Sequence, residues 1–162
     1  MKILVFAVII VVLVLLGFFY FRFQTYFIED RVNEELPVMA PDSQESAMQE
    51  PKILKQGDFV DADFFHKGSG KALILEYPDG RNLLRFEDFE VVNGPDVYVY
   101  LALTEKPEND LKSLRGYIDL GLMKGNIGNQ NYDLPNTDLT GYSSVVLWCK
   151  KFGVLFPYAV LK

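Results

Sequence analysis

The sequence predicts an all-β protein, an antiparallel β-sandwich-like domain that follows an N-terminal transmembrane helix. Three observations lead to this fold class. Residues 3–21 form an apolar run without a charge, residues 29–55 are rich in acidic, amide and proline residues, and residues 56–162 alternate apolar and polar residues in short runs. Alternation with a period of two is typical of strands with one buried face. We therefore expect an anchor with its flanks at 1–28, a tether at 29–55 and one folded domain at 56–162.

The first element is the run ILVFAVIIVVLVLLGFFYF, which lies between Lys2 and Arg22. At about 1.5 Å per helical residue, the run approaches the roughly 30 Å of a bilayer core. A cleaved signal peptide is the alternative, but its apolar region is normally only about 7–15 residues long and ends at a small-residue cleavage site. Aromatic residues instead crowd the sequence from Phe18 to Phe27, as in an aromatic belt at a membrane surface. We predict an uncleaved, single-pass anchor in the cell membrane.

The orientation of this anchor depends on few positive charges. The amino terminus and Lys2 lie on one side, and Arg22 and Arg31 lie on the other. Acidic residues in the second flank count for little in the positive-inside rule. We predict that the N-terminus is inside and that the C-terminal domain is extracytoplasmic.

The second element, residues 29–55, contains Pro37, Pro41 and Pro51 and little apolar periodicity. Such a segment cannot bury enough surface to offset the entropy of ordering its chain. The composition predicts a tether.

The remaining elements are short strands. In KALILEY, residues Leu73, Leu75 and Tyr77 share one face, and the PDG turn at 78–80 leads into RNLLRF, because proline presets one backbone angle and glycine accepts a positive one. In DVYVYLAL the valines and leucines face one side and the tyrosines face the other. EKPENDLKSLRG reads as a loop, since proline disfavours a long helix. Eight or nine such strands predict a sandwich or barrel.

The charge of the chain disfavours nucleic-acid binding, and its cysteine count excludes an intramolecular disulfide. The chain has 16 Lys and Arg against 22 Asp and Glu, a net charge of −6, and no basic run, so nucleic-acid binding is a poor hypothesis. One cysteine also excludes an intramolecular disulfide. The fold must therefore be stabilised by its core.

Five sequence blocks resemble a known family. They are Gly57-Asp58-Phe59, His66-Lys67-Gly68-Ser69-Gly70, NGPDVYVYLAL from Asn93, DLGLMKGNIGNQNYDLP at 119–135 and VVLWCKKFGVLFPYAVL from Val145. In this order the blocks resemble the DM-thirteen (DM13) electron-transfer domain, found in Skeletor-type proteins. The resemblance covers nearly the whole folded part.

The resemblance implies a redox role outside the cytoplasm. Such domains often occur beside domains that bind haem or pass electrons through membranes, and the proposed redox role also rests on a cysteine that matches Cys149. The resemblance does not name a cofactor, although haem or another redox prosthetic group could bind through Cys149. Since we expect one copy behind an anchor, the redox partner would be another protein.

Cys149 has two interpretations. Strand parity places Val145, Leu147 and Cys149 on one face, where a free cysteine can pack as a small hydrophobe. Alternatively it is a redox thiol or a metal or haem ligand, and nearby lysines could favour its thiolate. Lys150 lies on the opposite face by the same parity.

His66, the only histidine, could be a second ligand beside Cys149 or the base of a Cys/His pair. The glycines and serine that follow it favour a turn residue instead. No oxyanion hole or orienting group supports a catalytic dyad. Asp58, Asp61 and Asp63 fit no calcium loop, so no metal site is predicted.

The loop GNIGNQNYDLP holds Gly125 and Gly128, which permit positive backbone angles, and Asn129, whose amide can bond neighbouring backbone groups. Such a loop is either a rigid structural corner or a binding rim. We favour the corner.

These observations predict a membrane-anchored extracytoplasmic domain with an electron-transfer role through Cys149. The alternative is a cell-surface interaction or adhesion module in which Cys149 is core packing. A thiol-dependent enzyme is a third, weaker hypothesis.

Overall fold

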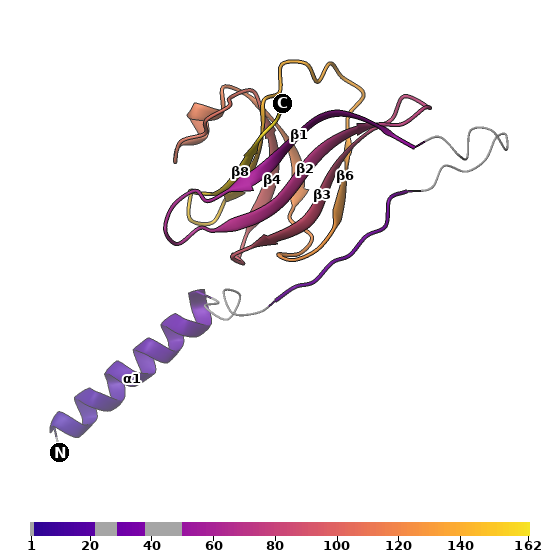
Figure 1. Cartoon of the computed structure of the whole chain (residues 1–162). Coiled ribbons are helices and arrows are strands. Elements are labelled where there is room, and N and C mark those ends of the chain that lie inside the picture. The colour runs from indigo at the N-terminus through magenta and orange to yellow at the C-terminus, as the bar shows by residue number, and fades with distance from the viewer. Residues whose placement is uncertain (1, 22–28, 38–49) are drawn as a thin grey trace.

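The computed structural model describes residues 2–21, 29–37 and 50–162 (Figure 1). In this part of the chain, one helix, eight strands and a 3₁₀ turn form. In chain order they are α1 (Lys2–Phe21), β1 (Lys52–Val60), β2 (Gly68–Glu76), β3 (Asn82–Val91), β4 (Val97–Ala102), η3 (Leu111–Leu114), β5 (Tyr117–Leu122), β6 (Gln130–Leu134), β7 (Ser144–Cys149) and β8 (Val154–Val160).

Helix α1 forms over the run that the sequence predicts to be helical, and it is 20 residues long. Among the residues described, no helix is found that has both the length and the apolar character to cross a membrane. The C-terminal flank of the predicted anchor, residues 22–28, lies outside the described residues. Membrane anchoring through residues 1–28 stays a prediction.

The eight strands form one antiparallel sheet in the order β5-β4-β7-β8-β1-β2-β3-β6. The all-β antiparallel fold is confirmed, but the sandwich-like arrangement is corrected to a nearly closed barrel (Figure 1). Strand β1 causes the difference, because it pairs with β2 along its length and also with β8 through Phe59 opposite Ala159 and Val60 opposite Tyr158. This short pairing joins what would otherwise be two separate sheets.

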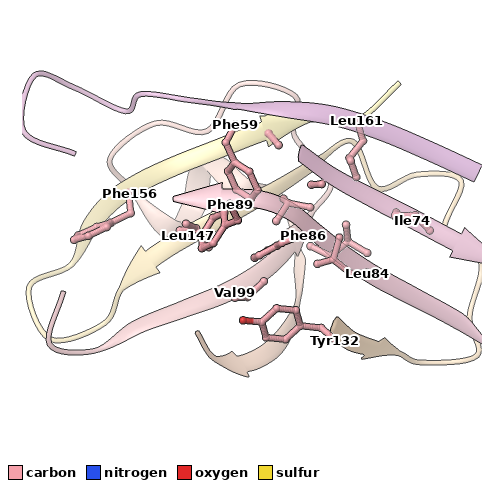
Figure 2. Packing of buried hydrophobic residues seen from close by; sticks show 14 of the residues in the cluster. Phe59, Ile74, Leu84, Phe86, Phe89, Val99, Tyr132, Leu147, Phe156 and Leu161 are labelled. Atoms are coloured by element: carbon pink, nitrogen blue, oxygen red, sulfur yellow. The ribbon is translucent and has the colours of Figure 1, made fainter. Parts of the chain in front are cut away.

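The barrel interior is packed with aromatic and aliphatic side chains (Figure 2). Phe59 lies edge-on to Phe86 with ring centroids 5.0 Å apart, and Phe89 lies 4.9 Å from Phe59 and 4.8 Å from Phe86. Offset and edge-on geometries are those that aromatic pairs prefer. The fully buried members also include Ala72, Ile74, Leu84, Val99, Leu101, Val145, Leu147, Cys149, Phe156 and Ala159.

A second apolar cluster covers the outside of β4 and β7. It contains Tyr100, Val146, Trp148 and Leu155, and the 3₁₀ turn η3 packs Leu114 against it. The predicted alternation is confirmed for Val97, Val99 and Leu101 on β4 and for Val145, Leu147 and Cys149 on β7, which all belong to the interior cluster. Leu103, predicted on the same face, lies beyond the end of β4 and is 39% exposed. Both faces of these two central strands are therefore buried.

Residues 29–37, which we call the strap, differ from the loose tether that their composition predicts. Val32 donates its backbone N–H to the carbonyl of Ile127 at 2.9 Å, and Glu34 donates to the carbonyl of Asn129 at 2.9 Å. Composition indicates how much apolar surface a segment can bury, but it does not indicate whether the backbone of that segment forms hydrogen bonds with a distant part of the chain. Strand β1 also begins at Lys52, inside the predicted tether, and residues 38–49 of that tether lie outside the described residues.

The strap also provides partners for buried polar side chains of β3 and β6. Arg85, only 5% exposed, donates from Nη1 to the carbonyl of Glu34 at 2.7 Å and to Oδ1 of Asn131 at 2.9 Å. The Nδ2 of Asn131 donates to the carbonyl of Glu35 at 2.8 Å. The Glu34 carboxylate accepts from Nζ of Lys124 at 2.8 Å and from the backbone N–H of Asn131 at 2.7 Å. The strap is thus part of the fold.

Candidate functional site

The candidate site residues all lie toward one end of the barrel. Because neighbouring strands are antiparallel, the loops 61–67, 92–96, 123–129 and 150–153 emerge at the same end, which we call the loop end. Cys149 is the last residue of β7 and leads into one of these loops. His66, Gly125, Gly128 and Asn129 lie in two others.

Backbone hydrogen bonds connect these loops to one another and to the strap. Val92 donates to the carbonyl of Lys67 at 3.1 Å, and Val91 donates to the carbonyl of Asn126 at 2.9 Å. Asn126 in turn donates to the carbonyl of Asp30 at 2.9 Å. The loop end is therefore one connected surface, although its parts are far apart in the sequence.

Cys149 is completely buried at this end. It belongs to the interior cluster and pairs with Val97 on β4 and Val154 on β8. Burial raises the pKa of the thiol, although the backbone N–H groups of Phe152, Lys151 and Asp96 act in the opposite direction. Since burial outweighs these dipoles, the thiol is neutral in the folded protein near neutral pH.

Lys150 does not approach the thiol. Its Nζ lies 2.8 Å from Oδ2 of Asp119 and 3.4 Å from the centroid of the Tyr98 ring, on the outer face of the barrel. The hydrogen bond to Asp119 raises the pKa of the ammonium group. The sequence-based hypothesis that neighbouring lysines favour a Cys149 thiolate therefore finds no support at Lys150.

A row of tyrosines adjoins Lys150 on this outer face. Tyr98 lies 6.5 Å from Tyr100, which stacks on Tyr117 at 4.3 Å between ring centroids. Burial raises the pKa of Tyr100 to about 12. The row runs from the half-buried Tyr98 to Tyr117, which is 41% exposed.

His66 is held in a structured turn. Its Nδ1 lies 2.8 Å from Oδ2 of Asp63, and its ring packs on Phe156 with centroids 4.5 Å apart. The hydrogen bonds that Asp63 accepts from the side chain and the backbone N–H of His66, together with the one from the backbone N–H of Phe65, lower the pKa of Asp63 to about 2. None of the described contacts of His66 involves Cys149, so the structure brings the two residues to the same end without joining them.

The 123–129 loop forms a corner that carries the strap. Gly128 has a φ of 100°, which favours glycine, and a side chain there would collide with the carbonyl of Val32. Gly125 has an ordinary φ, but a side chain there would meet the carbonyl of Asp30. Asn129 accepts from the backbone N–H of Asp88 at 3.0 Å through its Oδ1.

Two buried polar side chains stabilise this corner from inside the barrel. Gln130, fully buried, donates to the carbonyl of Gly125 at 2.7 Å, and its Oε1 accepts from the hydroxyl of Tyr132 at 2.7 Å. The Tyr132 hydroxyl accepts in turn from the backbone N–H of Lys124 at 3.1 Å. Burial raises the pKa of Tyr132 well above its ordinary value, so this hydroxyl remains a donor.

A family model described as electron transfer DM13 matches residues 58–161. The chain belongs to the DM13 electron-transfer family. The resemblance that the five sequence blocks predict is confirmed, and the match covers more than half of the chain. Comparison with curated proteins and with solved structures gives no match. The DM13 match begins within β1, so the strap lies outside it.

A haem or another large prosthetic group does not fit at Cys149 in this DM13 domain. The sulfur lies among packed core side chains, and Val97 and Phe156 belong to the same cluster. The pocket beside Asp30 and Met123 reaches Val97, but neither this pocket nor the pocket beside Asp61 has Cys149 among its lining residues. Binding a large group through Cys149 would require the core to be displaced.

The acidic residues of the 61–67 loop act as hydrogen-bond acceptors. Asp61 accepts through Oδ1 from the backbone N–H of Gly68 at 3.0 Å, and Asp63 accepts from the loop backbone as described above. Asp58 lies on β1. Among the described residues, no group of three or more His, Cys, Asp and Glu side chains could hold a metal ion.

Sequence reasoning missed Phe64 and Phe65 in the first loop. They are 78% and 74% exposed, more than any other large apolar side chain of the described DM13 domain. The signal was available, because two adjacent aromatic residues stand among the acidic and small residues of DADFFHKGSG.

Proposed function

We propose that this protein transfers electrons at the extracytoplasmic surface of the cell membrane, with Cys149 of its DM13 domain as the redox group. The family match over residues 58–161 carries the redox class. Cys149 is proposed because it is the only thiol of the chain. The anchor is proposed from the uncharged apolar run at residues 3–21.

The proposed step needs the sulfur to be deprotonated and accessible. In its simplest form the thiol proton passes to water, and one electron moves from the thiolate to an oxidised partner protein, which is reduced while a thiyl radical remains on the sulfur. Return of one electron and one proton restores the thiol. Because burial raises the pKa of Cys149, the step requires the turn at 150–153 to open. That turn contains the exposed Phe152 and is closed by a hydrogen bond from Gly153 to the carbonyl of Cys149 at 2.9 Å.

The thiol is tested by comparing Cys149→Ala with Cys149→Ser. Both variants should retain cooperative unfolding, followed by the fluorescence of the buried Trp148, and both should lose the redox signal of the wild type. Serine should cost more stability, by about 1–3 kcal/mol, because it places a hydroxyl in an apolar site. A redox signal that persists in both variants would remove Cys149 from the proposal while leaving the family assignment intact.

The anchor is tested with a reporter that is active only outside the cytoplasm, fused after Lys162. We expect an active reporter and a mature chain that retains its N-terminus, since the apolar run predicts an uncleaved segment. Cleavage near Gly17 would identify a signal peptide. An inactive reporter on an uncleaved chain would reverse the orientation.

A second candidate function is a cell-surface interaction module. The complete burial of Cys149 and its neutral thiol favour this candidate, because they are the properties of a packing cysteine. A wild-type thiol that is labelled only on unfolding, with no redox difference between wild type and Cys149→Ala, would favour this function over electron transfer.

A further inference from the structure

We propose that the 61–67 loop inserts Phe64 and Phe65 into the interfacial region of a lipid bilayer. This inference rests on the proposed membrane anchor and adds a second contact between the protein and the membrane. The two rings are 78% and 74% exposed and lie edge-on to each other, 5.3 Å apart. The adjacent rings leave apolar surface in water, and contiguous exposed apolar surface is typical of sites that bind a membrane or another protein.

The exposure of the two rings follows from the hydrogen bonds of the loop. Oδ1 of Asp63 accepts from the backbone N–H groups of Phe65 at 2.7 Å and His66 at 2.8 Å. Ala62 donates its N–H to the carbonyl of His66 at 2.9 Å, which closes the loop at its base. The His66 ring packs on Phe156 of the interior cluster, so the histidine turns inward while the two phenylalanines point outward.

Side chains near this tip suit a lipid headgroup region. The Nζ of Lys67 lies 5.3 Å from the centroid of the Phe64 ring, so its ammonium group can remain in water while its stem covers the aromatic surface. The neighbouring 150–153 loop adds Phe152, which is 43% exposed, and the exposed Lys151. The two loops are adjacent because β1 pairs with β8. Aromatic and basic residues together are typical of membrane interfaces.

The path of the chain favours a bilayer over a protein partner. At the loop end, the carbonyl of Asp30 accepts a hydrogen bond from the backbone N–H of Asn126, and the carbonyl of Asn126 accepts one from Val91. Val91 pairs with Gly68 at the start of β2. Nine peptide units separate Asp30 from Phe21, the last residue of α1. They can span at most about 30 Å. With α1 anchored, the loop end therefore lies within this reach of the membrane.

The acidic charge of the protein determines which bilayer should be used as the probe. The chain has a net charge of −6, so anionic lipids would repel it as a whole. Insertion of the tip should depend on the aromatic rings, and vesicles of zwitterionic phosphatidylcholine are sufficient to detect it.

The test places a tryptophan in the loop of the full chain. Phe65→Trp is reconstituted in phosphatidylcholine vesicles with brominated acyl chains, which quench nearby tryptophan. Tyr117→Trp is the matched control, because Tyr117 is 41% exposed and begins β5 at the opposite end of the barrel. The native Trp148 is only 3% exposed and contributes the same background to both variants.

We expect the additional emission of Phe65→Trp to fall at least about twofold in brominated vesicles, and that of Tyr117→Trp to stay unchanged. Phe64→Trp provides a second variant with the same expected result. Flotation of the vesicles reports the anchor separately. Protein that floats but shows equal quenching at both positions would overturn tip insertion and leave the anchor standing. Protein that does not float would overturn the anchor and this inference with it.

Discussion

At the residue scale, the Asp63 carboxylate interacts with three groups of the 61–67 loop. It accepts from two backbone N–H groups and lies 2.8 Å from Nδ1 of His66. The hydrogen bonds from His66 and Phe65 lower the pKa of Asp63 to about 2, against an ordinary value of 3.8. Hydrogen bonds to the ionised form have this effect because they stabilise the charge. The loop is thus ordered by a carboxylate that remains ionised in mild acid.

The interaction of Asp63 with His66 predicts how the 61–67 loop responds to pH. Because the pKa of Asp63 is depressed in the folded state, its contribution is complete above pH 3.8 and is lost as the pH falls toward 2. In a carboxyl-carbon NMR titration, we expect a midpoint of about 2 for Asp63. In His66→Gln, the midpoint should rise toward 3.8, because the hydrogen bond from the imidazole, which lowers the pKa of Asp63 most, is removed. An unchanged midpoint in that variant would show that the backbone N–H groups alone hold the carboxylate.

The sequence correctly predicts which side chains face the interior where the alternation of a strand determines it. The alternation along β7 places Cys149 inside and Lys150 outside, as strand geometry requires. Buried polar residues could not be foreseen in the same way. Arg85 lies in RNLLRF, which reads as a half-exposed strand, and its burial follows from a strap carbonyl contributed by Glu34. A partner 51 residues away in the sequence leaves no local signal.

At the scale of elements, the 123–129 loop joins the two edge strands and carries the strap. Gly128 donates its N–H to the carbonyl of Phe89 at 2.7 Å and also lies against the backbone of Val32. The glycine and asparagine content of this loop predicts an irregular, specified shape. The sequence does not say what the loop contacts, because that depends on a segment nearly a hundred residues earlier in the chain.

Gly128→Ala and Gly80→Ala separate backbone strain from the contact with the strap. Both glycines have a positive φ, 100° and 83°, but only Gly128 faces another backbone, whereas a side chain at Gly80 would meet open space. Gly80→Ala should cost only the conformational penalty, of the order of 1 kcal/mol. Gly128→Ala should cost clearly more, on the order of 3 kcal/mol, because the strap must also move. Denaturant unfolding measures both, and equal costs would contradict a steric role for the strap at Gly128.

The choice between sandwich and barrel also belongs to this scale. Eight short antiparallel strands are compatible with both architectures, and the strand count was predicted well. The decision is made by the few residues at the end of β1 that pair with β8. Register between strands from opposite ends of the domain depends on packing of the interior cluster, which local alternation cannot report.

At the scale of the whole molecule, the strap connects the N-terminal part of the chain to the DM13 domain. It lies outside the matched residues 58–161, yet it satisfies Arg85 and Asn131, which are 5% and 9% exposed. The domain therefore depends on residues that its family definition does not include. A buried donor that loses its partner costs about 1–3 kcal/mol, so the strap should contribute measurably to the stability of the whole domain.

We predict that a chain beginning at residue 50 is less stable than one beginning at Glu29 by about 2–4 kcal/mol, since several buried polar groups lose partners together. Glu34→Gln in the longer chain is the matched control, because it keeps the strap backbone and should cost only about 1 kcal/mol. Burial raises the pKa of Glu34, but the hydrogen bonds from Lys124 and Asn131 outweigh it and the pKa is lowered below 4.5.

The same pair of chains predicts a pH dependence. The contribution of ionised Glu34 is complete above pH 4.5 and declines as the pH falls through its lowered folded value. The difference in unfolding free energy between the two chains should therefore shrink in acid, and the difference between wild type and Glu34→Gln should shrink with it. Denaturant unfolding at pH 7 and at pH 3 measures both differences. Equal stability of the two chains at pH 7 would mean that water replaces the strap at Arg85 and Asn131 without cost, and that the domain is complete without residues 29–37.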